Sequence, residues 1–513
     1  MFSLLDFFVF VWGVYYLNRV WIGAEFPCGT QFLKDSELFI LYFTLRGLFS
    51  YFKVRAIYVV IILILFGCYE AILGLRQIID GRSRNPLYVL TGSFQNPGPY
   101  SAYLLMVVVA GLTIKSEVFS LINKSPLSIQ RYLSAAYFLL LALPIIILPA
   151  TWSRAALVAL IFWSLLYYRK FYWKWRYVVW GCLLITAITL YFIKQGSADG
   201  RMLTWTAGLT TWLHAPWLGV GVGGFRHACA EGIAELYAAY AFNPLFISGN
   251  VAEYAFCDIL KILVEQGVVG FVLCLVVVIL ALCNVFHYSK SLFYTMLVLF
   301  VFSLFSYPFE QYPYRTIAVM IAAIFPPRVN LISIRGWKRI SAAMLIGFTL
   351  IMASVLMATE IQVRRNADKD ANLLVGIQHS AFIKDYYELL PKENDNPQFI
   401  FIFAKILRNA GRYNDSNTLL REGTLISNDP MFYLLQGNNY RDMQCCDLAE
   451  EAYLKAYAVM PNRLYPLYQL MMLYKNTGQK TKMKYMARKI VRTRPKVASP
   501  ATEEIKNKAK ALL

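Results

Sequence analysis

Charged residues are scarce in this chain, since Asp, Glu, Lys and Arg together make up only 16% of its 513 residues. An ordinary soluble domain carries about 25% charged residues, so the composition excludes a typical soluble globular protein. Hydrophobic residues make up 58% of the chain instead, and its mean hydropathy is +0.48. This balance indicates an integral membrane protein.

Acidic residues are particularly few, with 30 Asp and Glu against 50 Lys and Arg, which gives a net charge of +20. In a membrane protein such an excess usually sets orientation and contacts anionic membrane lipid. Nucleic acid is not an expected partner, because the basic residues mostly flank apolar runs.

The chain also lacks the cysteine patterns of a metal site or a disulfide framework. Its nine cysteines include no CxxC pair and no Cys/His spacing, and several lie inside apolar runs. We therefore expect no metal and no other cofactor. The first apolar run, 2–17, contains Asp6 and has no basic leader or small-residue cleavage site, so it predicts a retained span and not a signal peptide.

Apolar runs long enough to form spanning helices recur along the first 360 residues. A spanning helix needs about 20 apolar residues. We identify runs near 2–17, 36–51, 56–75, 98–114, 132–150, 155–168, 177–194, 259–286, 292–307, 315–326 and 340–359. The sequence therefore predicts an all-α polytopic bundle of about 11 spans over residues 1–360.

The distribution of Lys and Arg among the connections predicts the orientation of these spans. Alternate connections are strongly basic, with Glu117 as their only acidic residue, and cytoplasmic loops carry such an excess. The other connections, which include a large loop at 195–258, mix both signs. We expect a cytoplasmic N-terminus and a periplasmic position for this loop and for residues 361–513.

Residues 361–513 carry less apolar sequence and contain a repeat. The 34-residue unit 430–463 places Tyr433, Gly437, Tyr440, Ala449 and Tyr453 at tetratricopeptide positions, and 464–497 repeats part of the pattern. We expect a soluble α-solenoid, which serves either as a stabilising cap or as a surface for a protein partner. The basic stretch 475–510 is either a solvated face or a contact for anionic lipid.

Two arginines on the predicted outer side suggest a phosphate-bearing substrate. Arg201 begins the segment RMLTWTAGLTTWLHAPWLGVGVGGF, and Arg154 lies in a short turn between two apolar runs. A charge this close to hydrocarbon is costly, so it either snorkels to lipid head groups or has a function. Arginine suits phosphate because its planar fork binds two oxygens at once.

Five segments together carry a resemblance to a known family. They are TGSFQNPGPYSAYL at 91–104, ATWSRAALVAL at 150–160, the segment 201–225, CDILKILVEQGVVG at 257–270 and SYPFEQYP at 306–313. The order of these segments, their spacing and their predicted position on the outer side of the membrane resemble those of the O-antigen ligase and O-antigen polymerase superfamily. This superfamily includes protein O-oligosaccharyltransferases. Some members also carry tetratricopeptide repeats.

The resemblance implies a GT-C-like glycosyltransferase in the bacterial inner membrane. Such enzymes transfer a glycan from undecaprenyl diphosphate to a hydroxyl on lipid A core, on another glycan or on a protein, with inversion and without a metal. By that likeness Arg154 and Arg201 bind the diphosphate, with Arg315 as the first candidate to assist. Fixed guanidinium groups would stabilise the charge that grows on the leaving diphosphate.

The residue that accepts the acceptor's proton is less clear from the resemblance. The family commonly has His-Asn at the start of the motif that here reads Phe256-Cys257-Asp258, and phenylalanine cannot act as a base. Asp258 and Glu253 are the candidate bases, with a structural role at the helix start as the alternative. Asn96, Trp205 and His214 are candidates for the donor site, although the tight turn around His214 favours a structural role.

Two other functions stay open at this point. One is a non-enzymatic glycolipid flippase or scaffold, which the lack of internal duplication disfavours. The other is a degenerate, inactive member of the superfamily, because of Phe256. The acceptor stays open among ligase, polymerase and protein transferase reactions.

Overall fold

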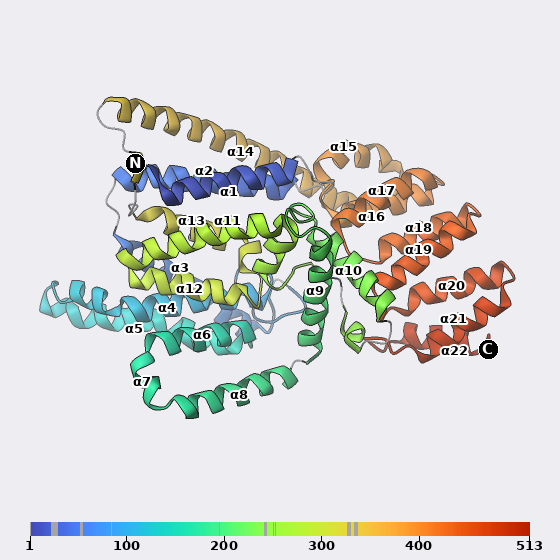
Figure 1. Cartoon of the computed structure of the whole chain (residues 1–513), viewed down its shortest axis with the longest axis horizontal. Helices are drawn as coiled ribbons and strands as arrows, with labels where there is room; N and C mark the ends of the chain where they lie inside the picture. Colours follow the sequence, from blue (N-terminus) through green and yellow to red (C-terminus); the bar gives the residue numbers. More distant parts are fainter. Residues whose placement is uncertain are drawn as a thin grey trace.

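The structure, a computed structural model, is almost entirely helical (Figure 1). It describes residues 2–21, 29–51, 55–83, 85–193, 195–240, 244–249, 251, 253–325, 330–332 and 337–513. Two short strands, β1 (Phe2–Ser3) and β2 (Asn330–Ile332), pair in antiparallel fashion at one end of the molecule. The expected all-α fold is confirmed.

Each of the eleven predicted spans overlaps one helix. These helices are α1 (Leu4–Trp21), α2 (Gly29–Tyr51), α3 (Ala56–Asp80), α4 (Pro97–Ile122), α5 (Leu127–Ala150), α6 (Arg154–Tyr167), α8 (Arg176–Ile193), α11 (Asp258–Tyr288), α12 (Lys290–Ser303), α13 (Tyr312–Ile324) and α14 (Trp337–Ile377). Among the described residues, α3, α4, α5 and α11 are long and apolar enough to cross a membrane, while α6, α12 and α13 are shorter apolar helices. The chain is therefore a multi-pass membrane protein.

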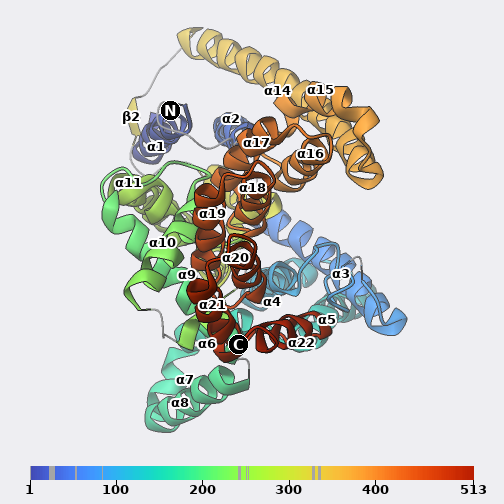
Figure 2. The same ribbon diagram turned by 90° about the vertical axis from the view of Figure 1, so that its right-hand side faces the viewer.

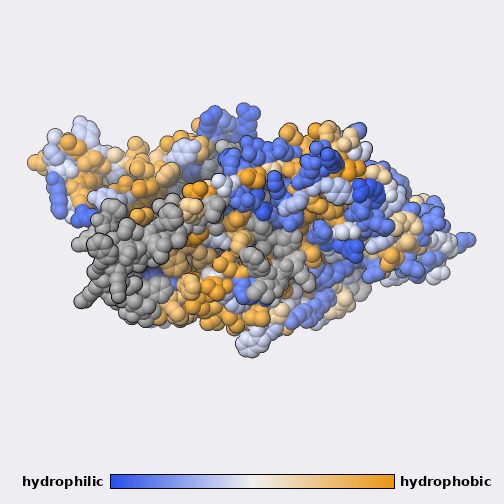
Figure 3. Space-filling view, turned by 90° about the horizontal axis from the view of Figure 1, so that it is seen from above, coloured by the Kyte–Doolittle hydropathy of each residue, from blue (hydrophilic) through white to orange (hydrophobic). Residues whose placement is uncertain are grey.

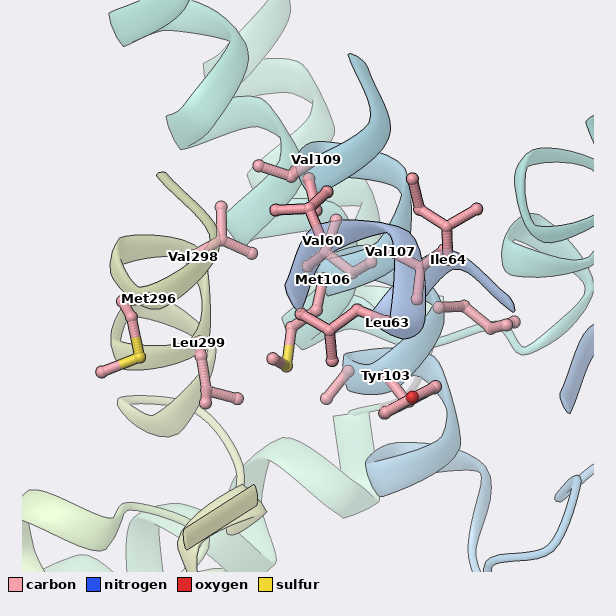
Figure 4. Packing of buried hydrophobic residues seen from close by; sticks show 14 of the residues in the cluster. Val60, Leu63, Ile64, Tyr103, Met106, Val107, Val109, Met296, Val298 and Leu299 are labelled. Carbon is pink, nitrogen blue, oxygen red and sulfur yellow. The ribbon is translucent and has the colours of Figure 1, made fainter. Parts of the chain in front are cut away.

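The bundle core lies where α3, α4 and α12 pack together (Figure 4). Val60, Met106 and Leu299 are buried there, one from each helix. Gly67 allows α3 to approach α4, because a β-carbon at this position would lie 2.4 Å from the side chain of Val107. Small residues at helix crossings are the usual means of close packing within a membrane.

Residues 195–258, expected to form a loop, are largely helical. They contain α9 (Gln195–His214), α10 (Phe225–Ala239) and η1 (Pro244–Ser248). α9 runs across the ends of the spanning helices at a steep angle to them (Figure 1). One side of α9 is buried against α10 and α11, while Leu209, Leu213 and the following Trp217 are exposed.

The C-terminal domain consists of the end of α14, which contributes Ala371 and Leu374 to its core, and an array of helical hairpins over residues 380–513. It contains η3 (Ser380–Phe382), α15 (Ile383–Glu393), α16 (Pro397–Asn409), α17 (Tyr413–Ile426), α18 (Met431–Asp442), α19 (Cys446–Val459), α20 (Leu464–Asn476), α21 (Lys480–Arg492) and α22 (Pro500–Lys510). Pairs α16–α17, α18–α19 and α20–α21 pack in succession; the tetratricopeptide assignment of these hairpins stays a prediction. Gly437 permits this packing, since a β-carbon there would lie 2.5 Å from the ring of Tyr453.

The division between membrane bundle and C-terminal domain falls inside one helix. The sequence places it at residue 360, where the apolar run ends, but α14 continues without interruption to Ile377. Helix-forming residues follow the apolar run, so the helix continues beyond the hydrocarbon. In Figure 1, α14 extends from the end of the bundle that holds the N-terminus to the C-terminal domain.

The C-terminal domain lies at the same end of the bundle as α9, and it curves over that end in the view of Figure 2. Figure 3 shows hydrophobic side chains over the spanning helices and mostly hydrophilic side chains over the C-terminal domain. The two parts of the chain are therefore suited to different surroundings, one to lipid and one to water.

Candidate functional site

The two predicted phosphate-binding arginines come together at the end of the bundle next to α9. Arg154 is the first residue of α6, whose start is capped by the Ser153 hydroxyl, which accepts a hydrogen bond from the amide of Ala156. The guanidinium of Arg154 donates to Ser197 Oγ on α9 at 3.2 Å. Four residues further along α9 lies Arg201.

Arg201 is held by neutral groups. Its Nη1 donates to the carbonyl of Phe305 at 2.7 Å, and its guanidinium lies over the ring of Phe256 at 5.0 Å from the centroid. Among the described residues, no carboxylate forms an ion pair with Arg201. Burial and, secondarily, the positive charge of Arg154 lower the pKa of Arg201 to about 10. It stays protonated at neutral pH, so two cations lie near each other here.

Phe256 is held in an uncommon backbone conformation beneath Arg201. Its φ of 52° lies in the left-handed region, which few residues other than glycine adopt. The ring meets Tyr307 edge to face at 5.4 Å, and Tyr307 stacks on Tyr254 with centroids 4.0 Å apart. Trp205 Nε1 donates to the carbonyl of Ala255 at 3.0 Å, which ties this segment to α9. Backbone strain of this kind is often found at functional sites.

The two candidate bases lie in different environments. Asp258 is only 6% exposed and accepts a hydrogen bond from the amide of Phe309 at 3.0 Å, so it joins α11 to the segment before α13. Glu253 is exposed. Burial raises the pKa of both Tyr254 and Tyr307, and the charge of Glu253, which precedes Tyr254 in the sequence, raises it further.

Arg315 is engaged elsewhere. It forms an ion pair with Asp35 of α2, and the hydroxyl of Tyr16 donates to the same carboxylate. Its charge is thereby balanced within the bundle, whereas the charge of Arg201 has no such partner in the described part of the chain. We therefore leave Arg315 out of the candidate site.

A buried ionic cluster beneath the site was missed in the sequence. Lys261 Nζ lies 2.5 Å from a carboxylate oxygen of Glu310 and 3.9 Å from one of Glu265. Burial alone would raise the pKa of Glu310, but Lys261 lowers it below its ordinary value, with help from Arg315. The i, i+4 spacing of Lys261 and Glu265 was a usable signal, whereas Glu310 joins them only through the fold.

The glycine-rich segment 219–224 fixes α9 and α10 against α11. Its Val220 amide donates to the carbonyl of Val264 at 2.9 Å, where the kink of α11 at Gly267 frees that carbonyl. Gly267 has φ 65°, and a β-carbon there would lie 2.2 Å from the carbonyl oxygen of Trp217. The glycines in both segments therefore permit a close backbone contact that sets the position of α9.

The remaining predicted residues have structural contacts. Asn96 caps α4, with Oδ1 accepting from the amide of Gly98 at 2.9 Å. His214 Nε2 lies 2.9 Å from a carboxylate oxygen of Glu235 on the surface. His214 is 13 residues from Arg201 along α9, which corresponds to about 20 Å at 1.5 Å per residue. We therefore do not include His214 in the site.

One comparison with known proteins covers part of the chain. Residues 139–275 match a family model described as O-antigen ligase. The matched region contains Arg154, Arg201, Glu253 and Asp258. No curated protein matches the chain. The similarity to the O-antigen ligase superfamily is thus confirmed over this region, and it indicates a membrane enzyme of the glycan-transferring kind.

Proposed function

We propose that this protein transfers a glycan from undecaprenyl diphosphate to a hydroxyl acceptor at the periplasmic face of a bacterial inner membrane. The observation that carries the proposal is the proximity of Arg154 and Arg201, brought together from α6 and α9. Two neighbouring cations repel each other, so a bound dianion would relieve this cost. A diphosphate has the charge and the oxygen geometry for paired guanidinium groups.

In the proposed reaction, the acceptor hydroxyl attacks the anomeric carbon of the donor sugar. The bond from that carbon to the diphosphate oxygen breaks, its electron pair stays on the diphosphate, and the configuration inverts. Glu253 takes the proton of the acceptor hydroxyl, because it is exposed and lies three residues before Phe256, on whose ring Arg201 rests, whereas Asp258 is buried. Negative charge grows on the leaving diphosphate, where Arg154 and Arg201 stabilise it.

The position of α9 supports a lipid-linked donor. Leu209 and Leu213 are exposed one turn apart on α9, which lies across the ends of the spans, and Trp217 is exposed just after the helix ends. Such a helix suits the boundary between lipid head groups and acyl chains. In this arrangement Arg201 would meet a diphosphate at head-group depth, with its polyprenyl chain in the bilayer.

The test is glycan transfer by purified full-length protein that carries Arg154→Ala or Arg201→Ala. We expect each change to reduce kcat/KM for the undecaprenyl-diphosphate-linked glycan by at least about 100-fold, as for the removal of one oxyanion-stabilising donor. Arg82→Ala is the control, since it removes an exposed arginine that is not part of the proposed site. Undiminished transfer by both variants would refute the proposal. Movement of labelled lipid between leaflets without sugar transfer would favour a flippase.

The acceptor can be identified separately, by deletion of the gene. Loss of the ladder of lipopolysaccharide bands would indicate a lipid A core or glycan acceptor. An altered glycoprotein profile with normal lipopolysaccharide would indicate a protein acceptor.

A further inference from the structure

A short segment, 246–249, connects the C-terminal domain to α9. From the C-terminal side, Asn462 lies between α19 and α20 and is only 5% exposed. Its amide nitrogen lies within hydrogen-bond distance of three carbonyl oxygens, those of Phe246 (3.1 Å), Ile247 (3.1 Å) and Gly249 (2.8 Å). One buried side chain thus contacts most of the carbonyls of this segment.

Lys496 completes this contact. Its ammonium donates to the carbonyls of Ser248 at 3.1 Å and Gly249 at 3.3 Å. Burial and the charge of Arg463 lower the pKa of Lys496 below its ordinary value, but the carbonyl oxygens are good partners for its charged form. Asn462 and Lys496 together reach four consecutive carbonyls, from Phe246 to Gly249.

The same segment also lies against the part of α9 that carries Arg201. A β-carbon at Gly200 would lie 3.1 Å from the carbonyl oxygen of Ser248, and one at Gly249 would lie 3.2 Å from the side chain of Leu203. Phe246 and Leu203 are buried in the same hydrophobic cluster. The residues on either side of Arg201 in the sequence therefore pack on a segment that the C-terminal domain holds.

We propose that Asn462 and Lys496 are positioning residues for the diphosphate site. By fixing 246–249, they fix the first turns of α9, and with them Arg201 and the Ser197 hydroxyl that contacts Arg154. This inference rests on the proposed function, because it assumes that these arginines bind the donor. It gives the C-terminal domain a task within the reaction, beyond capping the bundle or binding a partner.

Other contacts hold the domain in place, so the role of Asn462 can be separated from attachment. Lys455 Nζ lies 2.5 Å from a carboxylate oxygen of Glu231 on α10, and Tyr237 of α10 meets Tyr457 edge to face at 5.4 Å. Loss of the Asn462 contacts should therefore leave the domain attached while the first turns of α9 become less well fixed.

The experiment uses full-length protein in detergent and measures the Kd of undecaprenyl diphosphate. Asn462→Asp is nearly isosteric, but it replaces the donating amide with a carboxylate that faces carbonyl oxygens. We expect about tenfold weaker binding, a typical magnitude for coupling between two sites, with little change in thermal unfolding. Lys496→Leu should weaken binding in the same direction, and Lys496→Arg, which keeps a donor, should restore it.

The matched control is Asn439→Asp. Asn439 is fully buried in the same domain, but its amide donates to Ser416 and Asn417 and not to residues 246–249. We expect this variant to bind undecaprenyl diphosphate within about twofold of the wild type, because it perturbs the domain without touching the segment.

Arg201→Ala separates failure of this inference from failure of the proposed function. If Asn462→Asp and Lys496→Leu bind like the wild type while Arg201→Ala loses binding, the positioning role is wrong and the diphosphate site stands. If Arg201→Ala also binds like the wild type, the proposed function itself is wrong. If Asn462→Asp fails to fold, the Kd values of Lys496→Leu and Lys496→Arg test the positioning role instead. Weaker binding by Lys496→Leu alone supports the role, and equal binding by both variants contradicts it.

Discussion

Replacement of Arg201 by lysine should move the pH dependence of donor binding toward neutrality. Burial, followed by the nearby charge of Arg154, lowers the pKa of Arg201 from 12.5 to about 10. A lysine has an ordinary pKa of about 10.4, so a similar reduction in the same place would give a pKa of about 8. The lysine ammonium would then lose its proton within the working range of the protein.

The sign of the effect follows from which form binds the donor. The protonated side chain attracts the diphosphate, so binding is complete below the pKa and is lost as pH rises through it. In the wild type Arg201 stays protonated between about pH 6 and 9, so we expect it to cause no change in kcat/KM for the donor over this range. For Arg201→Lys we expect kcat/KM to fall above about pH 8, by about tenfold per pH unit, since kcat/KM reports the free enzyme.

The assay is glycan transfer at low donor concentration across this pH range. Arg82→Lys serves as the control, because it makes the same chemical change at an exposed position. Ionisation of the diphosphate itself affects all three proteins equally and cancels in the comparison. If Arg201→Lys and the wild type gave parallel pH profiles, the idea that a partly buried cation beside Arg154 binds the donor would be refuted.

Two other changes test the remaining parts of the site. Glu253→Gln should lower kcat by about 100-fold or more, because the variant loses the proposed general base. The Kd for undecaprenyl diphosphate should not change. If a folded Asp258→Asn variant loses more kcat than Glu253→Gln, the base is Asp258 instead. Gly267→Ala should lower the free energy of unfolding by at least about 2 kcal/mol. The backbone φ of 65° is strained for alanine, and its β-carbon would lie 2.2 Å from the carbonyl oxygen of Trp217. An unchanged melting temperature would show that the kink does not need glycine.

The spanning helices could be predicted because each corresponds to one continuous run of apolar residues of sufficient length. α9 could not. Its sequence, QGSADGRMLTWTAGLTTWLH, contains glycines and threonines that favour helix only weakly. Packing of Leu203, Ala207 and Gly208 against neighbouring helices overrides that weak preference. A helix stabilised mainly by such contacts has little local signal.

In the candidate site, too, features set by neighbouring residues in the sequence could be predicted, whereas contacts between distant residues could not. The proximity of Arg154 and Arg201 followed from their predicted position on one side of the membrane, a property of each connection. The partner of Arg315 did not follow, since Asp35 is 280 residues away and no pattern links the two. Glu253 and Asp258 looked equivalent in the sequence, because burial, which separates them, depends on the segment around Phe309.

The geometry also gives Phe256, two positions before Asp258, a role in the candidate site. Arg201 lies on the ring of Phe256, which in turn lies on Tyr307. An aromatic face attracts a cation without neutralising its charge, whereas a carboxylate in its place would satisfy the guanidinium and weaken its attraction for a diphosphate. In the proposed reaction the proton goes to a different residue, and we propose Glu253, the exposed carboxylate that precedes Tyr254, whose ring stacks on Tyr307.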